Sequence, residues 1–534
     1  MEFDFSRSND PWINNGAVIL FNYIDENEKF DSIIKENNIK YDSNNLKIVC
    51  QDIDDLKKLL QLIIDDVHNN NYIRRKKKDL MIENNQLKTI DRLSFSPLTG
   101  FFFKGKHPKI GKKIPVDSLN DNLKLQYEKY HAEQKDIKII DSPGELDVID
   151  INNFNGKNTC DFCNQKLLSA KIQTTYYPFT ASFGKYRNFN SNFKRGMHIC
   201  ILCAISSFMV YYSLPYAISE KSLFFAFPVI TVKSENQKIW KFLETNTDIS
   251  AFNDYSNFSK KITNDPFYSF IELIKYLDDK IVNNINSEID APENEKNIVN
   301  AWKSLSWIIG YSTTDIIRSL YTYNDTKRLF HLIETMDSKN IDLSRLVRKF
   351  TLSNKSSNNN VYEREISRKI VFFEDVNHNI ELFYGDYIKS NNRHANEINM
   401  EGKIQTMGRS QSNSMYINKL NAFLYTYNEE VMKMDKKLID TCFYIGATIG
   451  EYCKGGDSKP EDKDMLYELR SCTNVVQFLQ FLDGATFKID NLNVPMNLLK
   501  EMNTKNWQDI KSLISIFAHQ VFYQKEKPKE EKVN

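Results

Sequence analysis

Four of the eight cysteines stand in two Cys-x2-Cys pairs, Cys160/Cys163 and Cys200/Cys203. Each pair lets two thiolates converge on one ion from a tight turn, and two pairs complete a tetrahedral site. The spacing therefore predicts a structural Zn²⁺ site with four cysteine ligands. Buried thiols or disulfides are the alternatives, and the paired spacing with an expected cytoplasmic location favours zinc. The ion would fix both ends of the segment that separates the pairs, residues 164–199.

The separating segment has an unusual charge pattern. No Asp or Glu occurs between residues 164 and 219, whereas residues 176–196 interleave aromatic, Asn and basic side chains. Cations neutralise phosphate, Asn and Arg hydrogen-bond to base edges, and rings stack or act as wedges. A surface loop with its lysine stems packed on apolar neighbours is the alternative. The residues predicted to contact DNA here are Tyr176, Lys185, Arg187, Asn188, Phe189, Asn190, Asn192, Lys194 and Arg195.

A second basic stretch, residues 104–113, follows three consecutive phenylalanines and contains Gly and Pro. Its backbone and lysines could approach phosphate closely, so Lys104, Lys106 and Lys109 are further DNA-binding candidates. The whole chain carries a formal net charge of only +1. Nucleic-acid contact must therefore come from local patches such as these.

The chain has 534 residues, of which 41% are hydrophobic, enough for several packed domains. The predicted fold class is α+β. A mixed α/β region covers residues 1–390 and contains the zinc-binding insert 160–203. A polar linker covers residues 391–414, and a helical bundle covers residues 415–534.

Local patterns predict several individual elements. The amphipathic pattern of residues 52–67 indicates a helix, and residues 136–151 and 221–233 have the character of strands. Residues 238–350 have largely helical spacing, and residues 369–383 suggest a hairpin turning at Asn377. Within the C-terminal bundle the predicted helices are 416–453, 461–482, 495–502 and 505–523.

The usual catalytic motifs are absent from the sequence: it has no phosphate-binding Gly-x4-Gly-Lys-Ser/Thr loop, no His-Glu-x2-His pair and no Gly-x-Ser-x-Gly elbow. Asp141, Glu145 and Asp147 could share a divalent metal, but no lysine follows at a nuclease spacing. We therefore expect a protein that is not an enzyme.

The remaining candidates have structural interpretations. His198 is expected beside the zinc ligands rather than among them. Cys50, Cys442, Cys453 and Cys472 occur singly in the sequence and are expected to be core thiols. Residues 199–219 form an uncharged run that begins at the second cysteine pair and contains serines and Pro215. This predicts a buried helix and no membrane span, and no secretory signal pattern opens the chain.

Three motifs together resemble a known family. They are Asn9–Gly16 (NDPWINNG), the two cysteine pairs, and Tyr176–Thr180 (YYPFT). With a helical C-terminus, they resemble the large subunit of the type I-B CRISPR Cascade complex, in its CXXC-CXXC branch. The resemblance implies a subunit that reads the protospacer-adjacent motif of target double-stranded DNA, aids unwinding and recruits a helicase-nuclease without being a nuclease itself.

The resemblance also implies partners. They are a guide RNA and the backbone and handle-binding Cascade subunits. The C-terminal bundle would stand in the place of a Cascade small subunit, and Met400, Met407 or Met415 could start it as a separate polypeptide. Two alternatives remain: a zinc-containing nucleic-acid-binding protein outside CRISPR systems, and a metal-dependent nuclease that uses Asp141, Glu145 and Asp147.

Overall fold

The chain separates into two compact units, Met1–Pro266 with Leu277–Lys327 and Phe267–Tyr276 with Arg328–Asn534. The first unit contains both small sheets and helices, whereas the second is helical. This arrangement confirms the predicted α+β class. The computed structural model describes residues 1–67, 73–74, 78–91, 94–95, 112–142, 149–173, 176–179, 197–213, 216–219, 222–229, 265–286, 300–301, 303–313, 317–350, 361–394, 412–455 and 463–523.

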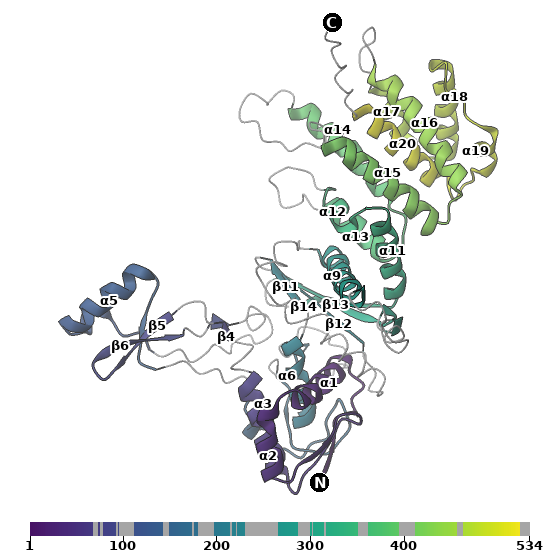
Figure 1. Cartoon of the computed structure of the whole chain (residues 1–534). Helices are drawn as coiled ribbons and strands as arrows, with labels where there is room; N and C mark the ends of the chain where they lie inside the picture. Colours follow the sequence, from purple (N-terminus) through teal and green to yellow (C-terminus); the bar gives the residue numbers. More distant parts are fainter. Residues whose placement is uncertain are drawn as a thin grey trace. The chain divides into compact units, whose positions relative to one another are not determined.

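Two buried helices, α1 (Pro11–Asp25) and α6 (Ile201–Ser213), pack against each other in the first unit (Figure 1). Asp10 caps α1 by accepting hydrogen bonds from the backbone N–H groups of Trp12 and Ile13, and Pro11 suits the first helical position. Every residue from Trp12 to Ile24 is buried. A helix buried on all sides belongs to the core rather than to a surface layer.

Smaller elements surround this pair. The amphipathic helix predicted at residues 52–67 is α3 (Ile53–Val67), and its apolar face is buried. A three-stranded antiparallel sheet has the order β1-β3-β2. The connection from β1 to β2 contains α1, η1 and α2, and a turn joins β2 to β3. Their bounds are β1 Glu2–Asp4, β2 Lys40–Asp42, β3 Lys47–Val49, the 3-10 helix η1 Glu28–Phe30 and α2 Asp31–Glu36.

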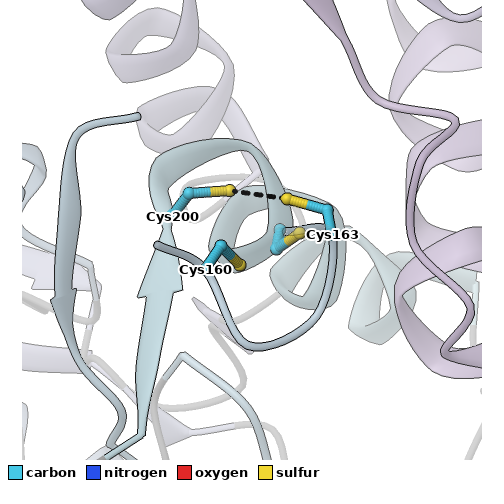
Figure 2. A group of neighbouring side chains, drawn as sticks. Cys160, Cys163 and Cys200 are labelled. Atoms are coloured by element: carbon cyan, nitrogen blue, oxygen red, sulfur yellow. Dashed lines mark hydrogen bonds between the residues drawn. The ribbon is translucent and has the colours of Figure 1, made fainter. Parts of the chain in front are cut away.

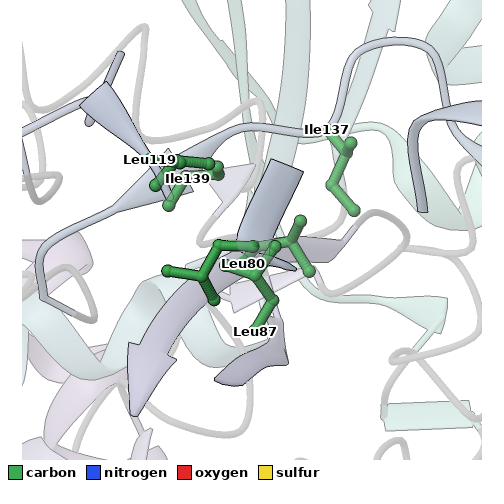
Figure 3. Packing of buried hydrophobic residues seen from close by; sticks show 6 residues of the cluster. Leu80, Leu87, Leu119, Ile137 and Ile139 are labelled. Atoms are coloured by element: carbon green, nitrogen blue, oxygen red, sulfur yellow. The ribbon is translucent and has the colours of Figure 1, made fainter. Parts of the chain in front are cut away.

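Residues 78–140 include a small sheet and helix with a core of their own (Figure 3). Strands β5 (Lys78–Glu83) and β6 (Gln86–Asp91) form a hairpin, and β8 (Ile139–Ile140) pairs with β5 in parallel. The hairpin turns at Asn84 and Asn85, both at positive φ, as a type I′ turn requires. The buried residues of this core are Leu80, Leu87, Leu119, Leu123, Ile137 and Ile139. The accompanying elements are α5 Asp121–Glu133, the 3-10 helix η3 Val116–Ser118, β4 Ile73–Arg74 and β7 Ser94–Phe95.

An antiparallel four-stranded sheet follows, in the order β11-β12-β13-β14. The strand predicted at residues 221–233 is β12, with Pro228 as its last residue. The prediction that residues 238–350 are largely helical is wrong at residues 307–313 and 317–323, which form β13 and β14. The bounds are β11 Tyr216–Ser219, β12 Ser222–Pro228, β13 Trp307–Thr313 and β14 Ile317–Tyr323.

The second unit is built around α20 (Trp507–Tyr523), which packs against α14, α16, α17 and α18 (Figure 1). The hairpin predicted at residues 369–383 is wrong, because α13 ends at Val371 and α14 begins at Asn377, with a short connection between them. The bounds are α9 Pro266–Asn286, α11 Thr326–Ser338, α12 Leu343–Val347, α13 Val361–Val371, α14 Asn377–His394, α15 Ser412–Glu430, α16 Lys436–Lys454, α17 Asp464–Ser471, α18 Val475–Lys488 and α19 Met496–Glu501.

The helical unit begins earlier than the predicted bundle. Helix α14 begins before the expected linker 391–414 and runs four residues into it, yet it packs against α20. The contacts divide the chain near residue 327 rather than near 391. Residues 395–411, the middle of the expected linker, lie outside the described residues. Two predicted helices are each divided into two, at residues 431–435 and 472–474.

Candidate metal centre

The first cysteine pair stands on a tight turn. The backbone N–H of Asn164 donates to the carbonyl oxygen of Cys160 at 3.0 Å, and the N–H of Cys160 donates to Gln165 at 3.0 Å. Asn164 has a φ of 57°, in the left-handed region that Asn tolerates better than most residues. This closed turn places Cys160 and Cys163 on the same side of the chain.

The second pair stands where a strand becomes a helix. Strand β10 (His198–Cys200) pairs with β9 (Ser169–Lys171), and Cys200 lies opposite Ser169. Helix α6 begins at the next residue, so Cys203 lies in its first turn. Free backbone N–H groups and the helix dipole favour thiolates at a helix N-terminus. The sequence therefore places both ligands of this pair where negative charge is stabilised.

The four sulfur atoms converge. All lie within 4.8 Å of one another, and the Sγ atoms of Cys163 and Cys200 are 3.6 Å apart (Figure 2). Zn–S bonds of about 2.3 Å in a tetrahedron would place sulfurs about 3.8 Å apart. A disulfide needs about 2.05 Å, and all four cysteines are free. The group fits one tetrahedral metal ion.

The ionisation of the four thiols supports a cation. Hydrogen bonding from Cys163 is the largest cause that lowers the pKa of the Cys160 thiol. Hydrogen bonding to Cys160 in turn raises the pKa values of Cys200 and Cys203 well above the ordinary range. The pKa of the Cys163 thiol is also lowered, so ionisation is favoured at the first cysteine pair and disfavoured at the second. A divalent ion would let all four ionise.

A pair of hydrogen bonds ties the turn to β10. The carboxylate of Asp161 accepts from the backbone N–H of His198 at 2.7 Å, and the N–H of Asp161 donates to the carbonyl oxygen of His198 at 3.0 Å. The group of possible ligand atoms in the described part of the chain contains the four cysteines and not His198. His198 thus holds the site together through its backbone.

The N-terminal motif packs on residues 177–179 and on helix α6, which carries Cys203. The Trp12 indole contacts the rings of Phe179 and Tyr211, with centroids 5.1 and 5.3 Å away. The hydroxyl of Tyr177 donates to the carboxylate of Asp10 at 2.6 Å. All three motifs that carry the family resemblance therefore belong to one buried cluster. Sequence reasoning missed the contacts of this scaffold, because they join residues far apart in the chain.

The predicted DNA-binding residues divide into two groups. Tyr176 is only 2% exposed and packs on Phe154, with ring centroids 4.9 Å apart. Its ring belongs to the core and offers no open face to a base. The others lie outside the described residues: Lys104, Lys106, Lys109, Lys185, Arg187, Asn188, Phe189, Asn190, Asn192, Lys194 and Arg195.

The nuclease alternative gains no support from the described residues. The carboxylate of Asp141 accepts a hydrogen bond from the backbone N–H of Lys112 at 2.7 Å, which joins two backbone segments. Glu145 and Asp147 lie outside the described residues. The four cysteines are the one group of three or more Cys, His, Asp or Glu that can hold a metal within the described ranges.

The four cysteines outside the two pairs and the long apolar run agree with the sequence predictions. Cys50, Cys442, Cys453 and Cys472 are all buried. The run at residues 199–219 contains the core helix α6. Across the helices that the structure describes, none combines the length and apolar character that crossing a bilayer requires.

Comparison with known proteins gives no assignment. No protein-family model matches the sequence, and a search of curated proteins finds no significant match.

Proposed function

We propose that this chain is the non-catalytic large subunit of a type I-B CRISPR surveillance complex. In that role it would read the protospacer-adjacent motif, help to open the duplex and recruit the helicase-nuclease. In such complexes the guide RNA recognises the target by base pairing. The protein therefore needs only to recognise a short duplex motif and to bind the nucleic-acid backbone. The family resemblance supports this role, and the arrangement around the metal centre supports the place of DNA contact.

The single observation that carries the proposal concerns the ends of the basic segment, residues 180–196. Just before it, Tyr177 and Phe179 are buried against Asp10 and Trp12. Just after it, Met197 is 6% exposed and its carbonyl oxygen accepts from the N–H of Ile172 at 3.1 Å. Both ends of the segment are therefore held in the framework of the metal centre.

The composition of the held segment supports nucleic-acid contact. It contains four basic side chains and no acidic one. Fixed end points lower the conformational entropy that a segment loses when its side chains bind a ligand. Lys185, Arg187, Lys194 and Arg195 are proposed to contact phosphate, and the neighbouring Asn residues to reach base edges. Lys104, Lys106 and Lys109 are proposed as a second phosphate-binding group.

Zinc is the ion proposed for the metal centre. Four thiolates in a tetrahedron suit Zn²⁺, and a fully protein-ligated ion has no open position for substrate. Its role would be structural: it would join the turn at Cys160–Cys163 to the start of α6.

The experiment uses this chain assembled with its proposed Cascade partners and guide RNA. The joint replacement Arg187→Ala and Lys194→Ala should weaken binding to target duplex. It should also reduce the slope of log affinity against log salt by about 1.8, or about 0.9 per phosphate contact. The matched control is Lys35→Ala with Lys40→Ala, two exposed lysines in the first unit. Equal slopes for both variants, or a chain that enters no RNA-containing complex, would overturn the proposal.

A further inference from the structure

One of the four thiols of the metal centre is accessible from outside. Cys160 and Cys200 are 0% exposed and Cys203 is 4% exposed, whereas Cys163 is partly exposed. Oxidation of cysteine is selective for thiolates that the oxidant can reach, so exposure decides which sulfur of a cluster reacts first. Cys163 is therefore the sulfur at which a small oxidant enters this site.

A second thiol lies directly beside Cys163. The Sγ atoms of Cys163 and Cys200 are 3.6 Å apart and face each other (Figure 2). A disulfide needs about 2.05 Å, so a small rotation of the two side chains joins these sulfurs. The four cysteines outside the cluster are buried and offer no comparable point of entry. Oxidation at this site therefore has a built-in partner sulfur.

Protein atoms alone also hold the two sulfurs together. Two hydrogen bonds join Asp161 to the backbone of His198, at 2.7 and 3.0 Å. Asp161 stands two residues before Cys163, and His198 stands two residues before Cys200. The turn thus remains attached to β10 when no metal ion is bound. A cluster that loses its ion keeps Cys163 beside Cys200, so that the loss can be reversed.

We propose that Cys163 and Cys200 form a redox switch that gives up the metal ion when hydrogen peroxide oxidises the pair. The Cys163 thiolate attacks one oxygen of the peroxide, the O–O bond breaks, hydroxide leaves and a sulfenic acid forms. The Cys200 thiolate then attacks the sulfur of Cys163, the S–S bond forms and a second hydroxide leaves. Both hydroxides take up a proton, so two thiolates are oxidised to one disulfide while peroxide is reduced to two water molecules.

The consequence of the disulfide is an incomplete ligand set. Cys160 and Cys203 remain as the only thiolates, whereas a closed tetrahedral site needs four ligands. The start of α6, which carries Cys203, then loses its metal link to the turn at Cys160–Cys163. A dithiol reductant regenerates both thiolates, and the site can be filled again. The switch depends on the four thiols and their backbone, and not on the nucleic acid that the chain is proposed to bind.

The first experiment treats the full wild-type chain, loaded with Zn²⁺, with hydrogen peroxide. We expect zinc to appear in solution, as measured with a chromogenic chelator, in step with the loss of two thiols per chain. Peptide mass spectrometry should identify a disulfide between Cys163 and Cys200 as the first oxidised product, and dithiothreitol with added zinc should restore the loaded site. Zinc that stays bound in excess peroxide, or a first disulfide between any other two cysteines, would overturn the proposal.

The second experiment compares two variants that differ only in which thiolate is lost. Cys163→His and Cys203→His each leave three thiolates and one imidazole, a ligand set that zinc accepts. Because only Cys163→His removes the accessible sulfur, peroxide should release zinc from it about 10-fold more slowly than from Cys203→His. Equal rates would show that peroxide does not enter through Cys163 and would overturn the proposal. If either variant fails to hold zinc, the disulfide mapped in the wild type decides.

Discussion

The indole N–H of Trp12 is shared between the carbonyl oxygen and the hydroxyl of Ser207, at 3.0 and 2.9 Å. The two residues are 195 positions apart in the chain. Ser207 lies one helical turn after Cys203 on α6, so α1 fixes the helix that presents a metal ligand. The N-terminal motif and the metal centre therefore form one structural unit, and disturbing either should disturb the other.

Gly16→Ala tests this coupling at the closest point between the two helices. A Cβ at Gly16 would lie 1.5 Å from the carbonyl oxygen of Ser206, so α1 and α6 would have to separate. We expect the free energy of unfolding to fall by about 3 kcal/mol or more. Because α6 moves, bound metal should also be lost to a chelator faster. Denaturant titration and a chelator competition assay measure the two effects.

The control for this substitution is Gly484→Ala, made in the open space on α18. There the new methyl group meets nothing, and alanine favours a helix by about 1 kcal/mol. Stability should therefore rise or stay level, and metal release should match the wild type. Similar losses in both variants would show that the contact between α1 and α6 is not what limits stability.

Cys203→Ser tests the metal centre itself. Removing one of four thiolates should reduce bound zinc from about one ion per chain to a small fraction, and it should destabilise the first unit. Elemental analysis of the purified protein measures the metal content. Cys50→Ser is the matched control, since Cys50 is also buried but donates its thiol to the carbonyl oxygen of Asp52. Unchanged zinc in the Cys203 variant would remove it from the ligand set.

The cysteine spacing predicted its site because ligand convergence depends on local turns. The turn at Cys160 and the strand-to-helix junction at Cys200 are short-range features, so they are readable from sequence. The contacts of Trp12 with α6 and of Tyr177 with Asp10 join residues far apart in the chain. No local pattern specifies such partners, and the scaffold of the site was therefore missed.

The errors in secondary structure have physical causes of the same kind. Strand β13 lies between β12 and β14, and Trp307 to Ile309 are buried without alternation. A continuous apolar run of this length does not distinguish strand from helix. At residue 377 the Asn-rich sequence suggested a turn, but Asp375 accepts a hydrogen bond from the backbone N–H of Asn377, where α14 begins. The cap at Asn474, which accepts from Gln477, was a readable helix start that the prediction overlooked.

Lys511→Met tests a buried ion pair that joins α14 to α20. Lys511 Nζ lies 2.9 Å from the carboxylate of Glu381, and their side chains are 6% and 1% exposed. Losing one partner leaves a buried charge and should cost about 3 to 5 kcal/mol, and the double variant with Glu381→Leu should recover much of it. Lys488→Met is the control: its partner Glu468 is 3.7 Å away and both are more than half exposed, so less than about 1 kcal/mol should be lost.

The same pair predicts a response to acid. Burial alone would raise the pKa of Glu381, but hydrogen bonds from His378 and Ser512 and the charge of Lys511 outweigh it and lower the pKa to about 2. Because the carboxyl pKa is lowered in the folded chain, the ion pair stabilises the fold at pH values above 4.5, the pKa in the unfolded chain. This contribution is lost as the pH falls towards 2. Glu381→Gln should flatten that part of the stability curve, as measured by denaturant titration between pH 5 and 3. An unchanged curve would contradict the assigned ion pair.

His519 on α20 should make the fold sensitive to milder acid. Its side chain is fully buried, and Nδ1 must donate to the carbonyl oxygen of Ser515, 2.6 Å away, because that oxygen can only accept. Burial lowers the pKa of His519 to about 4 from the ordinary 6.5. Between these values the unfolded chain binds a proton that the folded chain does not, so stability should fall as the pH falls, by about 3 kcal/mol in total.

His519→Leu removes the imidazole that titrates. The free energy of unfolding of the variant should therefore fall less between pH 6.5 and pH 4. Asp509 contributes the opposite slope in this range, since burial raises its pKa to about 6. The informative quantity is therefore the difference in unfolding free energy between variant and wild type at each pH, in which the contribution of Asp509 cancels. His131→Leu, at an exposed position on α5, should keep the wild-type curve. Parallel curves for the His519 variant and the wild type would show that the imidazole accepts a proton without leaving the folded core.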